Sequence, residues 1–303
     1  MLNRRILRIK AFKVIYSRTE NPSMTLKEGE GQLELSCEST RDLWLFMLAV
    51  TKALTDEARS RIEAARGKFN PTEEERNPNL KFAENRIAAL LAADPDFTRI
   101  IGRKKFSWDQ YDVFLRHLYD TLRTRDYYKA YMASAECGLK EDAALWKNIF
   151  ENEFEDNAEL EDILEDMRIW WNDDLPYALI WCCRTMDELG RGKPWSLLPL
   201  YMSDLSDKAE SDKAFVFKLI RTAFANYDDY VSRIAGITPK WDRSRICSTD
   251  LALIVAGLAE NAAFPELPSG VTINEYVEIS KYYSTPESRS FVNGILDKLI
   301  NTK

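Results

Sequence analysis

Glycine and proline are scarce in this chain, which has 11 of each among 303 residues. Both residues interrupt helices, so their low content favours long helices joined by few loops. No segment of the sequence alternates apolar and polar residues with the period of two that is typical of a half-buried strand. We therefore predict an all-α protein, and its length is comfortable for two domains.

Residues that commonly build catalytic and metal sites are also few. His117 is the single histidine, so a hydrolytic triad or a histidine-based metal site would be incomplete. The sequence has neither a glycine-rich phosphate loop nor a spaced acidic loop with glycine. We expect no catalytic site, no metal and no cofactor, and hence no enzyme.

Long apolar runs and an ordered cysteine pattern are missing as well. The best apolar runs, Leu43–Val50 and Leu251–Ala259, are eight and nine residues long, whereas a membrane helix needs roughly 20. The basic N-terminus has spaced apolar residues instead of the continuous run of a signal peptide. The five cysteines are scattered without metal spacing and suggest reduced thiols. These features predict a cytoplasmic protein without membrane contact.

Acidic residues are absent from positions 1–18, although the whole chain has a formal net charge of −7. Apolar residues recur there at helical spacing, which predicts one amphipathic helix with a basic face. Arg4, Arg5 and Arg8 should share that face. Guanidinium groups grip phosphates with paired hydrogen bonds, so the face could bind an RNA backbone; a solvated basic helix is the alternative. The cations of the segment are Arg4, Arg5, Arg8, Lys10, Lys13 and Arg18.

Basic residues are scarce between Glu141 and Asp174, where 13 acids stand against Lys147 and Arg168. Three interpretations are open. The segment could be a solvated helical surface, a docking site for a cationic protein, or a partner of the basic N-terminal helix that competes with RNA. The tryptophans within it, Trp170 and Trp171, are expected in the core.

Local signals predict where several helices begin. Capping boxes at Thr25, Ser107 and Thr272 should each open a helix, and Pro286 should occupy the first position of the last one. Further helices are expected at about 39–66, 175–189, 211–236 and 240–261. The polar stretches 70–79 and 190–210, which contain prolines, are expected to be surface linkers.

Two blocks far apart in the chain carry recognisable motifs. The first is N-R-R-I-L-R-I-K-A-F-K-V-I-Y-S at residues 3–17. The second runs from about Lys213 to Lys298 and contains R-I-C-S-T-D-L-A-L (245–253), V-T-I-N-E-Y-V-E-I-S-K (271–281) and F-V-N-G-I-L-D-K (291–298). Together they resemble the NusB family of transcription antitermination factors, whose first helix is arginine-rich, and the last two motifs are specific to it.

The resemblance implies an all-helical pair of three-helix bundles that performs no catalysis. It implies binding of boxA, a short single-stranded RNA element of ribosomal RNA leaders, together with the ribosomal protein NusE. The complex joins RNA polymerase and suppresses premature termination. Typical members are less than half as long as this chain. We therefore expect residues 1–52 to form the basic helix and part of the first bundle, 206–303 the remainder, and 53–205 a helical insertion of unknown role, acidic at 141–174.

The resemblance also selects candidate RNA contacts. Phe291 of F-V-N-G lies where the family binds RNA, which is held largely by stacking on aromatic side chains; core packing is the alternative. Arg289 beside it is a candidate phosphate contact, and Tyr16 is either a base contact or a core aromatic. The RNA-binding set is Arg4, Arg5, Arg8, Lys10, Lys13, Tyr16, Lys281, Arg289 and Phe291, with Lys298 a weaker candidate.

The pair Asn293-Gly294 is interpreted as structural. Glycine inside a helix costs roughly 1 kcal/mol relative to alanine, so Gly294 should mark a close approach of another helix.

Two other functions compete with RNA binding. A helical adaptor could keep the fold and use the insertion for protein contacts, but it would not need an acid-free basic helix. The same helical module also forms part of a ribosomal RNA cytosine methyltransferase. That enzyme needs a further cofactor domain with strands and glycine-rich turns, which we do not expect here.

Overall fold

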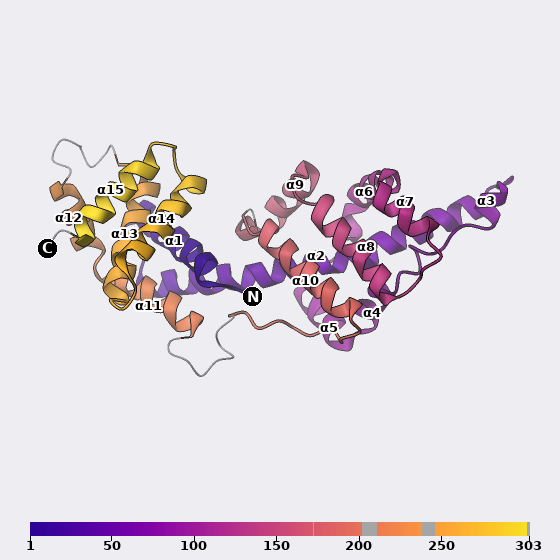
Figure 1. The fold of residues 1–303 in the computed structure, drawn as a ribbon, viewed down its shortest axis with the longest axis horizontal. Helices are drawn as coiled ribbons and strands as arrows, with labels where there is room; N and C mark the ends of the chain where they lie inside the picture. Colours follow the sequence, from indigo (N-terminus) through magenta and orange to yellow (C-terminus); the bar gives the residue numbers. More distant parts are fainter. Residues whose placement is uncertain (172, 202–210, 238–245, 302–303) are drawn as a thin grey trace. The chain divides into compact units, whose positions relative to one another are not determined.

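The computed structural model describes residues 1–171, 173–201, 211–237 and 246–301. Every regular element within these ranges is a helix (Figure 1), which confirms the all-α prediction. The chain forms two compact units, each with its own core. Unit 1 comprises Met1–Glu38 and Pro199–Lys303, and unit 2 comprises Ser39–Leu198. The limits 53 and 205 of the insertion stay a prediction. They mark where the resemblance to the family stops, whereas the two units are defined by their internal contacts.

Unit 1 is assembled around one buried helix, α13. Nearly every side chain from Ala252 to Glu260 is buried, and α1, α11, α14 and α15 all pack on this helix. A helix that is apolar on all sides is typical of the centre of a bundle. The helices of the unit are α1 (Arg4–Glu20), the start of α2 (Leu26–Arg66), α11 (Asp212–Ala225), α12 (Tyr227–Ile237), α13 (Ser248–Ala263), α14 (Ser269–Tyr283) and α15 (Ser288–Asn301).

A close approach of helices within unit 1 lies at Gly257, not at Gly294. A β-carbon on Gly257 would stand 2.7 Å from Cδ2 of Leu296 and 3.4 Å from Cδ2 of Tyr276. A β-carbon on Gly294 would meet no described atom within 4 Å. The packing role predicted for Gly294 is therefore wrong. Gly257 sits in the middle of an apolar run, where periodicity gives no sign that a glycine is required.

Unit 2 has a core rich in aromatic side chains. Phe46 of α2 stacks on Trp108 at 4.3 Å and on Trp171 at 5.4 Å between ring centroids. The Nε1 atom of Trp171 donates a hydrogen bond to the Ser39 carbonyl, so the prediction of a core residue is confirmed for Trp171. Trp170, for which the same was predicted, is only half-buried. The helices are the rest of α2, α3 (Glu73–Arg76), α4 (Arg86–Ala93), α5 (Pro95–Lys104), α6 (Asp112–Thr124), α7 (Asp126–Ala133), α8 (Leu139–Asn152), α9 (Ala158–Met167) and α10 (Leu175–Gly190), with 3-10 turns at Asp109–Tyr111 and Ile169–Trp171.

The cap at Thr25 forms as predicted, but the helix that it opens is longer than expected. The Thr25 amide donates to Glu28 Oε2 at 2.7 Å, and the Glu28 amide donates to Thr25 Oγ1 at 3.3 Å. The helix then continues without a break as α2 to Arg66, where the sequence suggested a second start near Ser39. Nothing between 26 and 66 is a proline, so no residue forces an interruption.

Three other predicted helix starts are wrong. Ser107 accepts a hydrogen bond from the Asp109 amide and opens only a 3-10 turn before α6. Thr272 lies inside α14, which already begins at Ser269. The last helix begins at Ser288, two residues after Pro286. The start expected at residue 240 falls outside the described ranges, as do residues 202–210 of the second predicted linker.

Among the described residues, no helix combines the length and the apolar sequence needed to cross a membrane.

Candidate nucleic-acid interface

Helix α1 begins at a side-chain cap and is divided into a buried and an exposed face. Asn3 Oδ1 accepts the Ile6 amide at 3.0 Å, which satisfies one of the free amides at a helix start. Leu7, Ala11 and Val14 are buried, and α1 packs on α11 and α13. Because the apolar face turns inward, only part of the basic residues can reach solvent.

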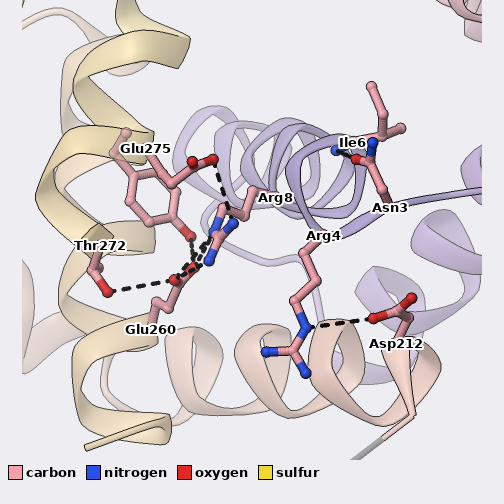
Figure 2. Close-up of polar contacts among 9 residues, drawn as sticks. Asn3, Arg4, Ile6, Arg8, Asp212, Glu260, Thr272 and Glu275 are labelled. Carbon is pink, nitrogen blue, oxygen red and sulfur yellow. Dashed lines mark hydrogen bonds and ion pairs between the residues drawn. The ribbon is translucent and has the colours of Figure 1, made fainter. Parts of the chain in front are cut away.

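Arg8 is the centre of a buried ionic cluster instead of a surface contact (Figure 2). Its side chain is 7% exposed and that of Glu260 is fully buried. The guanidinium donates from Nε and Nη2 to the Glu260 carboxylate, at 2.8 Å to Oε2 and 2.7 Å to Oε1. Tyr276 adds a hydroxyl donor at 2.9 Å and Thr272 one at 3.4 Å, while Glu275 lies 3.4 Å from Nη1. Arg8 therefore ties α1 to α13 and α14.

The ionisation of this cluster follows from its burial. Desolvation acts to lower the pKa of the Arg8 guanidinium, but the hydrogen bonds and charge of Glu260 outweigh it, so the pKa is raised. Burial is also the largest cause that raises the pKa of the Tyr276 hydroxyl, with the Glu260 charge adding to it. Arg8 thus stays charged and Tyr276 stays a neutral hydrogen-bond donor.

Arg4 and Lys10 do not join Arg8 on one exposed basic face. Lys10 is 1% exposed. Arg4 is half-exposed, donates from Nε to Asp212 of α11 at 3.4 Å (Figure 2), and lies 4.7 Å above the Phe215 ring. Arg8 lies over the same Phe215 ring, 5.4 Å from its centroid, whereas Arg5 is exposed. Arg4 and Arg8 therefore share one side of α1, but the three arginines do not form one exposed basic face, which corrects that prediction.

Arg5 and Lys13 of α1 lie near residues of the α14–α15 region. Lys281 donates to Glu278 at 2.5 Å, and this bond is the main cause of the lowered pKa of the Glu278 carboxyl; the charges of Arg289 and Arg5 add to it. Lys13 Nζ lies 5.4 Å from the Tyr283 ring centroid. We name Arg5, Lys13, Lys281 and Arg289 the cationic cluster. Its members come from opposite ends of the sequence.

The turn that joins α14, which carries Lys281, to α15, which carries Arg289, is anchored by a buried carboxylate. Asp250, at the start of α13, accepts hydrogen bonds from Ser284 Oγ at 2.6 Å and from Ser288 Oγ at 2.7 Å. The two serine hydroxyl oxygens lie 2.9 Å apart. Asp250 is 6% exposed. These bonds fix the backbone between α14 and α15, and hence the places from which Lys281 and Arg289 project.

The two predicted aromatic contacts lie at different depths. Tyr16 is 38% exposed and lies on the same side of α1 as Arg5 and Lys13. It borders a hollow whose other lining residues are Ser17, Glu20, Asn21, Met24, Glu28 and Gln32. Phe291 is half-buried on the first turn of α15. An exposed aromatic that sequence reasoning missed is Tyr282, whose side chain is 77% exposed.

The acidic segment of unit 2 is not one uniform surface. Asp142 accepts from the Tyr131 hydroxyl and the Arg86 amide, Glu153 accepts from Arg125 and Tyr127, and all three of Asp142, Glu153 and Asp174 are buried. The acids of α9, by contrast, are mostly exposed. Structural and solvated carboxylates therefore alternate along 141–174. The three interpretations of this segment stay predictions.

His117 stands on the surface of unit 2, with Nδ1 3.3 Å from Glu159 Oε2. No group of three or more histidine, cysteine or acidic residues with metal-site geometry occurs among the described residues.

Comparison with known proteins identifies the C-terminal part of the chain. The NusB family matches residues 191–301, which include α11 to α15. The "Transcription antitermination protein NusB" of Acetivibrio thermocellus is 35% identical over 97 residues, covering 32% of this chain and 67% of the relative. The protein of the same name from Methylacidiphilum infernorum is 31% identical over 113 residues, covering 37% and 79%. That from Geobacter sulfurreducens is 29% identical over 111 residues, covering 37% and 80%. No solved structure matches the chain.

The matched region includes α13, α14 and α15 and the sequence motifs that these helices carry. The matched proteins are transcription antitermination proteins by name, and the membership bears out the expectation that the chain is not an enzyme. On this evidence, the chain belongs to the NusB family.

Proposed function

We propose that this chain is an RNA-binding transcription antitermination factor that acts on ribosomal RNA transcription. It binds boxA-type single-stranded RNA together with the ribosomal protein NusE, as part of an antitermination complex on RNA polymerase in the cytoplasm. The observation that carries the proposal is the cationic cluster. Cations from the first and the last 25 residues of the chain, all within unit 1, lie near the end of α14, which carries the exposed Tyr282 and the half-buried Tyr283.

The chemistry of the cluster suits a single strand. Phosphates attract cations, and arginine can bind them with two parallel hydrogen bonds. We assign Arg5, Lys13, Lys281 and Arg289 to the phosphates. Unpaired bases can stack on aromatic side chains, whereas the bases of a duplex are already stacked on one another. We therefore assign Tyr16 and Phe291 to contacts with bases. Arg4, half-exposed beside Asp212, extends the cationic surface on the α11 side.

Two members of the sequence-based set do not fit a direct contact. Arg8 is 6% exposed and Lys10 is 1% exposed, and a phosphate could reach neither without opening the helix packing. Removing Arg8 from Glu260 would also leave a buried carboxylate unpaired, which is strongly unfavourable. We assign Arg8 to assembly of the fold that presents the cationic cluster.

A second candidate function is protein recognition by unit 2. Residues 39–190 lie outside the family match, yet unit 2 has its own aromatic core. Because unit 2 has its own core, it could bind a partner through its surface without disturbing RNA binding at unit 1. The same chain could therefore act as a helical adaptor as well. Capture of a partner by residues 39–198 would support this function beside the first.

The test is RNA binding by the full chain, measured by fluorescence anisotropy with boxA-type RNA and with a scrambled control, each with and without NusE. The variant Arg5→Ala/Lys281→Ala/Arg289→Ala should weaken binding. For single strands the salt slope changes by about 0.7 per phosphate contact, so the loss of three contacts should flatten it by about 2.

The matched control is Arg99→Ala/Arg191→Ala/Lys193→Ala, which removes three exposed cations that unit 2 pairs with Asp96 and Glu188. Both triple variants change the net charge equally. Binding that is equally reduced in the two variants, or unchanged in the first, would reject the cationic cluster as the RNA site.

A further inference from the structure

Tyr282 is an aromatic side chain presented to solvent at the last turn of α14. It is 77% exposed, twice the value of Tyr16, and no ring contact, hydrogen bond or ion pair joins its side chain to another described residue. A single exposed apolar residue is common on protein surfaces and needs no explanation. The surroundings of Tyr282 set it apart from that case.

Cations lie near Glu278, one helical turn before Tyr282 on α14. Lys281 precedes Tyr282 directly, and the charges of Arg5 and Arg289 act on the same Glu278 carboxylate as Lys281. The next residue, Tyr283, behaves differently, because its ring packs 5.4 Å from Phe12 and lies under Lys13. Of these two neighbouring tyrosines, Tyr283 therefore packs against α1, whereas Tyr282 is largely exposed to solvent.

The backbone beneath Tyr282 is held in place. The Ser284 amide donates to the Ser280 carbonyl at 3.0 Å and closes α14. Ser284 and Ser288 are both bound to the buried Asp250. A ring on such a fixed turn loses little backbone freedom when a ligand stacks on it, which favours binding.

We propose that Tyr282 is a stacking platform for one unpaired nucleobase of the bound RNA. The proposal rests on the function proposed above and deepens it by adding a base subsite between the phosphate contacts Lys281 and Arg289. An aromatic ring flanked by cations matches the alternation of base and phosphate in a single strand. A protein partner with an apolar surface could pack on the ring, but it would form no favourable contact with the nearby cations.

The test compares Tyr282→Ala and Tyr282→Phe with the wild-type chain. Stacking on an aromatic side chain is worth about 1–3 kcal/mol per base, so Tyr282→Ala should weaken single-stranded RNA binding about 5- to 150-fold. Tyr282→Phe keeps the ring and should bind like the wild type. Phe69→Ala, which removes a fully exposed ring from unit 2, is the matched control and should have no effect.

An RNA series with one abasic nucleotide at each position identifies the stacked base. One abasic position should weaken the wild-type chain by the same factor as Tyr282→Ala, and the variant should show no further loss at that position. Full-strength binding by Tyr282→Ala, or independent and additive losses at every position, would overturn the inference while the RNA-binding function stands.

Two other results separate the inference from the function. If the wild-type chain binds no RNA with or without NusE, the proposed function fails and the inference fails with it. If Tyr282→Ala weakens NusE capture but leaves RNA affinity unchanged, the ring is a protein contact and the inference is overturned alone. The thermal unfolding midpoint of each variant should equal that of the wild type, because the ring is exposed.

Discussion

Replacing Arg8 should destabilise unit 1 far more than replacing its exposed neighbour Arg5. Arg8 and Glu260 are joined by hydrogen bonds of 2.7 and 2.8 Å in a site from which solvent is excluded. Removing one partner of a buried ion pair costs about 3–5 kcal/mol, because the other charge is left without compensation. Arg5→Ala removes an exposed cation from the same helix, and such changes usually stay within about 0.5 kcal/mol.

The structure also predicts a partial rescue. In Arg8→Met/Glu260→Gln neither member of the buried pair carries a charge, and only the partly exposed Glu275 remains ionised beside it. The glutamine carbonyl can still accept from Tyr276, and its amide can donate to the Thr272 hydroxyl, which lie at different oxygens of Glu260. The double variant should therefore be more stable than Arg8→Met alone, a non-additivity expected only of residues in direct contact. A double variant that loses the sum of the single effects would show that the two residues act independently.

Hydrogen exchange measured by mass spectrometry is the suitable assay, because it separates unit 1 from unit 2. Peptides of α1, α13 and α14 should exchange about 100- to 4,000-fold faster in Arg8→Ala, because a loss of about 3–5 kcal/mol corresponds to a factor of ten per 1.4 kcal/mol. Peptides of α8 and α10 serve as the internal control. Equal exchange in Arg8→Ala and Arg5→Ala would refute the structural role of the buried cluster.

Three further predictions follow from particular contacts. Gly257→Ala should destabilise the chain by about 1–3 kcal/mol through overpacking against Leu296, whereas Gly294→Ala should stabilise it by up to about 1 kcal/mol; urea unfolding checks both, and a neutral Gly257→Ala would contradict the close approach. Asp250→Ala should lower the thermal midpoint and weaken RNA binding at temperatures where the chain is folded, since two serine hydroxyls lose their acceptor; unchanged RNA affinity would show that the turn does not position the cationic cluster. Burial raises the pKa of the Cys183 thiol to about 11, so its alkylation rate should still be rising with pH between about 9 and 11, and a plateau near pH 9 would refute this.

Local patterns in the sequence predicted the helices well, because the signals for helices are local. The absence of acids and the apolar spacing at residues 1–18 correctly indicated α1, and the cap at Thr25 formed as its motif requires. The same motif at Thr272 failed. Its hydroxyl lies inside α14 and donates to Glu260 instead, so a tertiary partner took the group that the motif would have used.

The burial of charges could not be predicted from the sequence. Arg5 and Arg8 are the same residue type three positions apart, yet one is exposed and the other is paired with a carboxylate 252 residues away. Helical spacing predicts the direction in which each side chain projects from α1, but it does not predict which other helices pack on that side. The exposure of Tyr282 and the anchoring by Asp250 were missed for the same reason, since both depend on the approach of α13 to the turn after α14.

The most direct test of the central claim is to cross-link bound RNA to the full chain with ultraviolet light and to identify the attached peptides by mass spectrometry. A boxA-type RNA should attach to peptides of α1 and of residues 281–291, and the attachment should be lost in Arg5→Ala/Lys281→Ala/Arg289→Ala. Attachment confined to peptides of residues 39–198, unaffected by that triple variant, would contradict the claim that the cationic cluster of unit 1 binds the RNA.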